Sequence, residues 1–217
     1  MKKFELIVGL IAIFGITLKI LHIVGGSILT MLALTVLSVF YYALSFAFFN
    51  DIKLRNILKK ESYKDTNAKR MVGAIGLGWT LSLIIMGGLF KLQLWVGASM
   101  QLLVGLVTLG LIFLVALFFY FRNKAEYYKR IFKRIIIYGG LGLILYLIPT
   151  TTFLNFYYAN NPNYTEHPNF AEHYKKVLAE PDNLKLRDQL EQMKFELKQM
   201  KFEKWKQEQN GKNMENE

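Results

Sequence analysis

Residues 99–121 read SMQLLVGLVTLGLIFLVALFFYF, a run without a charged side chain. About 20 apolar residues in a helix are enough to cross the hydrocarbon core of a bilayer, which is roughly 30 Å thick. Four other segments have a similar length and composition; they cover residues 6–24, 28–49, 71–92 and 135–157. We therefore predict an all-α polytopic membrane protein whose residues 1–157 form a transmembrane domain of five helices.

The composition of the chain agrees with this class. Its mean hydropathy is +0.25, and 53% of its 217 residues are apolar. Lys2 and Lys3 precede the first apolar segment, as in a signal peptide, but no small-residue cleavage site follows and the second segment begins almost at once, so we expect a mature helix. The chain has no cysteine, which excludes disulfides and cysteine-bound metals.

Charge is distributed unevenly along the chain. Residues 1–157 carry 17 basic and 5 acidic side chains, whereas residues 158–217 carry 10 and 11. Most of the basic side chains of the first part lie in the segments 50–70 and 122–134, and loops enriched in Lys and Arg stay on the cytoplasmic side of a membrane. We therefore place the N-terminus and both basic loops in the cytoplasm and the tail outside it.

The second basic loop also bears on partners. Its apolar residues recur at helical spacing among Lys and Arg, so we expect helix to continue past the membrane with an apolar stripe at the headgroup boundary. These residues are Tyr127, Tyr128, Ile131 and Phe132. A solvated basic face that anchors the helix ends is the favoured explanation, and a specific patch for a lipid or a partner is the alternative. Membrane lipid is thus an expected partner, and nucleic acid is not.

The first 121 residues contain an internal repeat. The shift that brings Gly15 onto Gly87 also brings Lys19, Gly25 and Ser27 onto Lys91, Gly97 and Ser99. The repeated unit is a helical hairpin, at about 4–49 and again at about 71–121, and both copies keep the same orientation. Three glycines, Gly25, Gly26 and Gly97, lie where the hairpins must turn, and glycine permits the dihedrals or the close helix approach that such turns need.

Lys19 and Lys91 occupy equivalent positions, roughly one turn from the outer boundary of the membrane. An ammonium group can reach the interface from there on its four-carbon stem. Alternatively, both lysines pair with a partner's carboxylate or with a backbone carbonyl inside a bundle. His22 has no counterpart in the second hairpin, where residue 94 is leucine, and we predict an interfacial side chain rather than a proton carrier.

Residues 158–217 are predicted to form a separate extracytoplasmic tail with a short helix at about 170–179 and a longer, coiled-coil-like helix at about 183–207. The longer helix carries apolar residues at alternating steps of 4 and 3, which is the heptad pattern. This association seam consists of Leu186, Leu190, Met193, Leu197 and Met200. Such a seam must be buried, either by oligomerisation or docking on a partner's helix, which we favour, or by folding back on the short helix.

Motifs of catalysis and cofactor binding are missing from the sequence. It contains no nucleophile elbow, Walker loop, dinucleotide fingerprint or His-Glu-x-x-His pattern. His167 and His173 are six residues apart, which suits neither one helical face nor a known pair of metal ligands. We therefore predict a protein that is not an enzyme and that holds no metal or cofactor.

One segment carries a likeness to a known family. Residues 87–113, GGLFKLQLWVGASMQLLVGLVTLGLIF, resemble the transmembrane hairpin of GldL, the inner-membrane subunit of the gliding-motility and type IX secretion motor. The likeness rests on Gly88-Leu89-Phe90-Lys91, Gly97-Ala98 and Gly105-Leu106-Val107-Thr108, and residues 16–27 are similar to a more diverged copy. The resemblance implies a bacterial inner-membrane protein that packs its helices around the single-span helix of a periplasmic partner and turns proton flow into motion.

One position departs from this family. The family carries a glutamate directly after the Gly-Leu-x-Thr element, whereas this chain has Leu109, and Leu37 at the equivalent place in the first hairpin. Proton-driven work needs an intramembrane group that binds and releases a proton, and the five predicted spans contain neither Asp nor Glu. We therefore predict a structural or accessory subunit that assembles with itself or with a periplasmic or single-span partner. The alternative is a small ion or solute transporter or channel with Lys19 and Lys91 lining the path.

Overall fold

The computed structural model describes the chain except for residues 65, 155, 158–168 and 215–217. Every regular element in the described residues is helical, so the predicted all-α class is confirmed for that part of the chain. The chain divides into two units, Met1–Pro149 and Thr150–Glu217.

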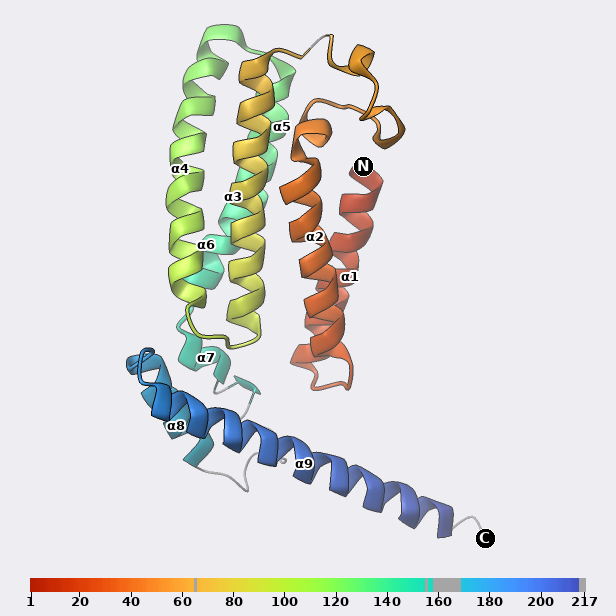
Figure 1. Ribbon diagram of the computed structural model, residues 1–217, viewed down its shortest axis with the longest axis vertical. Helices are drawn as coiled ribbons and strands as arrows, with labels where there is room; N and C mark the ends of the chain where they lie inside the picture. Colours follow the sequence, from red (N-terminus) through yellow and green to blue (C-terminus); the bar gives the residue numbers. More distant parts are fainter. Residues whose placement is uncertain (65, 155, 158–168, 215–217) are drawn as a thin grey trace. The chain divides into compact units, whose positions relative to one another are not determined.

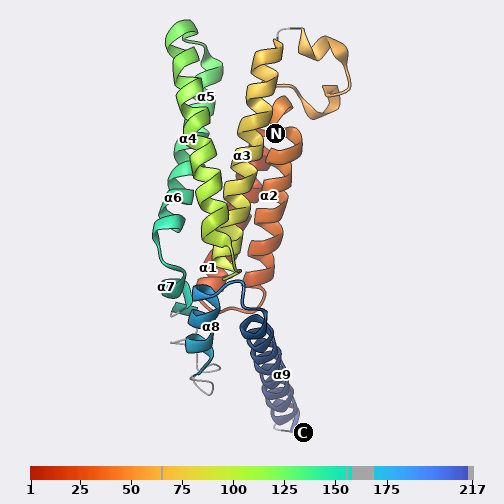
Figure 2. The same ribbon diagram turned by 60° about the vertical axis from the view of Figure 1, so that its left-hand side comes forward.

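Four long helices form two hairpins in the first unit. The first hairpin consists of α1 (Lys2–Ile20) and α2 (Gly26–Phe49), and the second of α3 (Ala68–Leu92) and α4 (Ala98–Asn123). The four helices run side by side (Figure 1 and Figure 2), and α2 packs against both α1 and α3. The basic segment between the hairpins contains two short 3₁₀ turns, η1 (Leu54–Asn56) and η2 (Lys60–Tyr63).

Three of these helices are long and apolar enough to cross a membrane: Gly26–Phe49, Ala68–Leu92 and the Ala98–Arg122 part of α4. Helix α1 is shorter, with charged side chains in its first turn and Lys19 in its last. Large apolar side chains such as Ile13 on α1 and Leu114 on α4 are exposed, which suits contact with lipid rather than with water. The first unit therefore has the character of a helical bundle embedded in a membrane.

The helix near the predicted fifth span begins in the second basic loop, as the sequence predicts, and is interrupted before Pro149. Helix α5 (Glu126–Arg134) continues through a π-helical segment, η3 (Ile135–Gly139), into α6 (Gly140–Leu147). Ile148 then takes the extended dihedrals φ −73° and ψ 120°, because a residue before proline avoids the helical region and Pro149 has no N–H to donate. The structure thus has a helical segment from Glu126 to Leu147, and the interruption at Ile148 and Pro149 lies within the predicted span 135–157.

Large apolar side chains and glycines form the core of the first unit. Tyr41, Leu77 and Leu102 are completely buried between α2, α3 and α4. A Cβ atom at Gly78 of α3 would overlap the side chain of Ser45 on α2, so glycine is required for this close approach. Because lipid provides no hydrophobic driving force between helices, such close packing is a main source of their attraction.

The second unit contains α7 (Thr150–Leu154), α8 (Asn169–Ala179) and α9 (Leu184–Met214). The Asn183 side-chain oxygen accepts a hydrogen bond from the backbone N–H of Leu186 at 3.3 Å, which caps α9. Helix α9 extends beyond the predicted end at residue 207 and finishes at Met214. Helix α8 packs against α9, and its side chains Phe170, Tyr174 and Val177 are buried.

Candidate functional site

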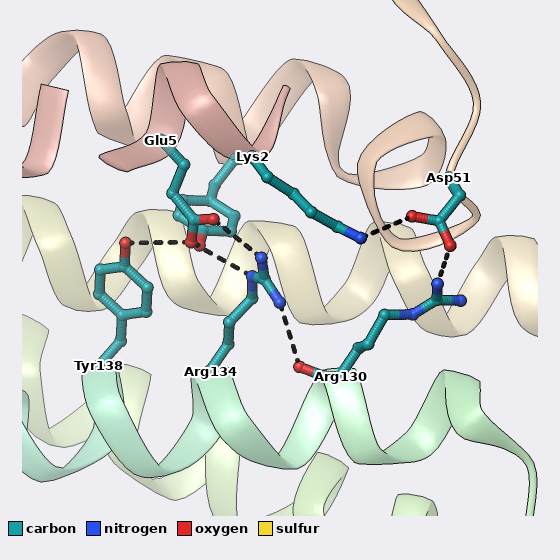
Figure 3. A network of polar contacts seen from close by, with 7 residues as sticks. Lys2, Glu5, Asp51, Arg130, Arg134 and Tyr138 are labelled. Atoms are coloured by element: carbon teal, nitrogen blue, oxygen red, sulfur yellow. Dashed lines mark hydrogen bonds and ion pairs between the residues drawn. The ribbon is translucent and has the colours of Figure 1, made fainter. Parts of the chain in front are cut away.

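A cluster around one carboxylate joins the start of α1 to α2 and to the α5–η3 segment (Figure 3). Glu5 Oε2 accepts a hydrogen bond from Arg134 Nη2 at 2.8 Å, and Glu5 Oε1 accepts one from Arg134 Nε at 3.2 Å. The hydroxyls of Tyr41 and Tyr138 also donate to Oε1, that of Tyr138 over 3.4 Å. The side chains of Glu5 and Arg134 are only 15% and 12% exposed, so this is a bidentate, charge-assisted pair in largely buried surroundings.

The guanidinium group of Arg134 has further contacts inside the bundle. It lies 4.3 Å from the ring centroid of Phe48 and 5.6 Å from that of Phe49, and its Nη1 donates to the backbone carbonyl of Arg130 over 3.3 Å. Aromatic faces attract a guanidinium group through their quadrupole. The apolar end of α2 therefore provides a favourable environment for a positive charge that would otherwise be costly to bury.

A second group of charges lies beside the first (Figure 3). Asp51, which closely follows α2, pairs with Arg130 of α5 and, at 3.2 Å, with Lys2 of α1. Asp51 is about half exposed, so these pairs contribute less to stability than a buried pair does. Together the two groups connect the start of α1, the end of α2 and the second half of α5.

Sequence reasoning missed the pairing of Glu5 with Arg134. The first span was predicted to begin at residue 6, but α1 begins at Lys2, so Glu5 lies in its first turn and its carboxylate is largely buried. The available signal was that Glu5 is the only acidic residue before Asp51 and directly precedes an apolar run. A lone carboxylate in such a position needs a partner.

The predicted lysines lie in the last turns of α1 and α3, close to the hairpin turns. Lys91 is 1% exposed and donates to Ser99 Oγ at 2.9 Å. Lys19 donates to the backbone carbonyl of Leu92 and, at 2.9 Å, to Gln93 Oε1. Lys19 thus bonds to groups of the second hairpin, including a backbone carbonyl, and links the two hairpins.

Gln93 is a further linking residue, which no pattern in the sequence had singled out. Its Oε1 accepts from Ser27 Oγ at 2.8 Å, and its Nε2 donates to the backbone carbonyl of Ser27 over 3.1 Å. Ser27 lies at the start of the second helix of the first hairpin, and Gln93 ends the first helix of the second. The polar side chains at this end of the bundle therefore bond to one another across the two hairpins.

The two hairpin turns have the same backbone geometry. Gly25 and Gly97 have φ values of 91° and 85°, and His22 and Leu94 have 58° and 59°. In the first turn the N–H of Ile23 donates to the carbonyl of Leu18 at 2.9 Å, and in the second the N–H of Trp95 donates to that of Phe90 at 2.8 Å. This is the Schellman arrangement of a helix end, and it recurs at the spacing of the sequence repeat.

The third predicted glycine, Gly26, lies at a close helix contact. It is the first residue of α2, and a Cβ atom there would overlap the backbone of Lys19 and Leu18. His22 is exposed and occupies the left-handed position of the first turn. Neither the charge nor the ring of His22 is needed for this backbone geometry, because Leu94 adopts it too.

The predicted association seam lies on α9 and partly faces α8. Leu190 and Leu197 are buried, whereas Leu186, Met193 and Met200 are half-buried. His173 Nε2 lies 3.1 Å from the carbonyl oxygen of Leu186, and the ammonium group of Lys194 lies 5.7 Å from the ring centroid of Tyr174. Part of the seam is therefore covered within the chain, as in the second of the two predicted alternatives. His167 lies outside the described residues.

These features define a helical membrane protein of two hairpins and an additional helical segment, joined by an ion pair at one end and by lysine hydrogen bonds at the other. Residues 76–135 match the family model of the GldL N-terminal domain. The match covers most of α3 and all of α4 and α5, and it includes residues 87–113, so the resemblance of that segment to GldL is confirmed. Residues 16–27 lie outside the match. No curated protein and no solved structure matches the chain.

Proposed function

We propose that this chain is a non-enzymatic structural or accessory subunit of the bacterial inner membrane, related to the gliding-motility and type IX secretion motor. We also propose that it assembles with itself or with a periplasmic or single-span partner. The observation that carries the proposal is the match of residues 76–135 to the GldL N-terminal domain. It falls on the α3–α4 hairpin and on α5, which hold Lys91 and Arg134, two basic residues buried in the bundle.

The proposal includes five membrane spans, with the N-terminus in the cytoplasm. Helix α1 has 19 residues, and α5, η3 and α6 have 9, 5 and 8 in one continuous helical segment. At about 1.5 Å per residue, α1 extends about 29 Å, close to a hydrocarbon core of roughly 30 Å. The uncharged part of the second segment, η3 and α6, extends only about 20 Å, so the proposed fifth span also needs the residues that follow Pro149. The charged ends of both would then lie at the cytoplasmic interface, where the Glu5–Arg134 pair joins them.

The shared turn geometry supports the inference that the two hairpins are copies of one unit. Non-glycine residues rarely adopt positive φ, yet His22 and Leu94 do so at equivalent positions. The packing is also shared: a Cβ atom at Gly15 would lie 2.8 Å from the backbone N of Thr30, and one at Gly87 would lie 3.1 Å from that of Leu102. These two contacts fall at matching positions of the sequence repeat.

The surroundings of Glu5 favour a structural role over a motor role. A proton-driven motor needs a carboxylate that gains and loses a proton in each cycle. Glu5 accepts hydrogen bonds from Arg134 and from two tyrosine hydroxyls, so both of its carboxylate oxygens are bonded to groups of the bundle. Leu109 is in the place of the family's glutamate. We infer that Glu5 holds α1 against α5 rather than carrying protons.

The transporter alternative receives less support from the geometry. A path for an anion would need the ammonium groups of Lys19 and Lys91 to face open, hydrated space. Both instead donate hydrogen bonds to protein groups, and Lys91 is almost completely buried. We therefore retain the subunit as the proposed function.

Affinity purification of the full-length protein from its native membrane in mild detergent tests this proposal. We expect it to co-purify with further copies of itself or with a membrane-anchored periplasmic protein at a fixed stoichiometry. Reconstituted liposomes should show no ion flux above that of empty liposomes. Recovery of a lone monomer, or a flux that Lys19→Met and Lys91→Met abolish, would contradict the proposal.

A further inference from the structure

A cavity of about 430 Å³ lies between α3, α4 and α5. It is bordered by the first two turns of α3, the last turns of α4 and one face of α5. These are the helix ends that adjoin the basic loops. Neither the Glu5 cluster nor the two lysines of the hairpin ends line this cavity, so its chemistry is separate from that of the groups described above.

The end of the cavity next to the basic loops, which we call its mouth, is basic. Lys69, Arg70 and Arg122 contribute to its lining, and none of the ion pairs found among the described residues involves these three side chains. Three cationic groups therefore lie at one end of the cavity without an ion pair to a described carboxylate. Such a concentration of positive charge in a concave site attracts an anion.

Arg70 is held in place at this mouth. The hydroxyl of Tyr127 donates a hydrogen bond to the backbone carbonyl of Arg70 at 2.9 Å, and the Arg70 guanidinium lies 5.6 Å from the Tyr127 ring centroid. Tyr127 is itself buried, so its ring has little freedom to move away from Arg70. The position of the basic group is thus partly fixed before any ligand binds.

The walls of the cavity are apolar. Ile112, Val115 and Phe119 lie on one face of α4, spaced three and four residues apart, and Ile131 of α5 also lines the cavity. Val115 is also exposed on the outer surface of α4. The cavity is therefore continuous with the apolar surface that would face lipid tails in a membrane.

The combination of a basic mouth and apolar walls selects an amphiphilic anion. A free phosphate would satisfy the three basic side chains but leave the apolar walls without a partner, and an uncharged lipid would do the reverse. Basic pockets between membrane helices on the cytoplasmic side suit anionic headgroups. We propose that this cavity binds one anionic phospholipid, with its phosphate at Lys69, Arg70 and Arg122 and the beginning of an acyl chain along α4.

Native mass spectrometry of the full-length protein in detergent tests the charged part of the site. The protein is supplied with phosphatidylglycerol, phosphatidylcholine or inorganic phosphate. We expect one phosphatidylglycerol to be retained, no phosphatidylcholine, and no displacement by excess phosphate. Arg70→Gln with Arg122→Gln should lower the retained fraction about tenfold. The matched control, Arg55→Gln with Lys60→Gln, removes the same charge from exposed positions that do not line the cavity and should change nothing.

A second pair of variants tests the apolar part. A Cβ atom at Gly73, which lines the cavity, would come no closer than 3.7 Å to the Tyr127 hydroxyl. Gly73→Phe should therefore fill the cavity and abolish lipid retention, whereas Gly73→Ala should leave it intact. Equal retention of the two lipids, or an equal effect of the control pair, would overturn the proposal. Retention in Gly73→Phe together with displacement by phosphate would identify a site for free phosphate instead.

Discussion

Glu5 and Arg134 show how the bundle accommodates opposite charges at the edge of its apolar core. Removing either ion from water costs several kcal/mol, and their mutual attraction offsets this cost only where the geometry is good and the remaining donors and acceptors are satisfied. Here two hydrogen bonds join the pair, two tyrosine hydroxyls donate to Glu5, and Phe48 covers the guanidinium. Replacing only one partner should therefore lower the free energy of unfolding by more than the net stabilisation that the intact pair provides.

We predict that Glu5→Gln lowers the free energy of unfolding of the first unit by about 3 kcal/mol, since it leaves the Arg134 charge buried without a carboxylate. Thermal unfolding in detergent measures this loss. Replacing both partners, Glu5→Gln with Arg134→Met, should recover part of it because no charge then stays buried. The matched control is Glu126→Gln, whose ion pair with Lys129 is exposed and contributes little. Equal losses in Glu5→Gln and Glu126→Gln would show that the Glu5 pair is not buried.

At the scale of helices, the contact between α2 and α3 depends on one glycine. Gly78 faces Ser45 so closely that a Cβ atom cannot be added without moving a helix, whereas Gly76, half a turn away, has no atom within 4 Å of such a Cβ. We predict that Gly78→Ala destabilises the first unit by about 1–3 kcal/mol through overpacking. Gly76→Ala, the matched control, should be neutral or slightly stabilising because alanine favours helix. Thermal unfolding of the two variants tests this difference. Equal unfolding temperatures would exclude the close contact at Gly78.

The α8–α9 contact should be sensitive to alkaline pH. Burial, and then the nearby charge of Glu191, raise the pKa of Tyr174 above its usual value of 10.0. Near pH 10 the tyrosine hydroxyl of an unfolded chain loses its proton, whereas the folded unit keeps it. The free energy of unfolding of the second unit is therefore unaffected by this group below pH 10 and falls as the pH rises further. The Tyr174 hydroxyl has no hydrogen-bond partner among the described residues. Tyr174→Phe should therefore preserve the contact and weaken its pH dependence. Amide hydrogen exchange of α8 and α9 at pH 9 to 11 measures the contact and its pH dependence. A Tyr174→Phe variant whose protection falls with pH as steeply as that of the unmodified protein would contradict this account.

The elements that were predictable from the sequence are those whose length and composition alone determine them. The apolar runs of α2, α3 and α4 are long enough that helix is the main way to satisfy their backbone in lipid. The break at Ile148 depends on a local signal, Pro149, that lay inside a predicted span. The pairing of Glu5 with Arg134 could not be predicted, because they lie far apart in the sequence and only the packed helices bring them together. The heptad pattern of α9 is the same whether the seam faces α8 or a second chain.

At the scale of the whole molecule, orientation in the membrane is directly testable. The chain has no cysteine, so single-cysteine variants can be labelled without background. Val24, in the α1–α2 turn, is 93% exposed, and Leu58, in the basic segment after α2, is 98% exposed. We expect a membrane-impermeant maleimide to label Val24→Cys from the periplasm, and Leu58→Cys only after the inner membrane is opened, because the basic loop stays inside. The reverse pattern would invert the proposed topology.

The proposed assembly also concerns the whole molecule, and the exposed side chains of α9 indicate which of its faces could take part. Leu190 and Leu197 are buried within the chain, whereas Phe195 and Phe202, one heptad apart, are 60% and 56% exposed. Exposed aromatic side chains are typical of contact surfaces between proteins. Association through α9 should therefore use its outward residues rather than the predicted seam.

Native mass spectrometry of Phe195→Ser with Phe202→Ser tests this assignment. We predict that the two substitutions abolish the proposed assembly and leave monomers, while helical content and membrane insertion stay unchanged, because neither side chain belongs to the buried α8–α9 contact. Leu190→Asp places a charge inside that contact, so it should lower the helical content of the second unit. An assembly that survives the double phenylalanine variant, but dissociates in Leu190→Asp without loss of helix, would mean that the seam pairs between chains. Helix α8 would then be displaced from α9 in the assembled protein.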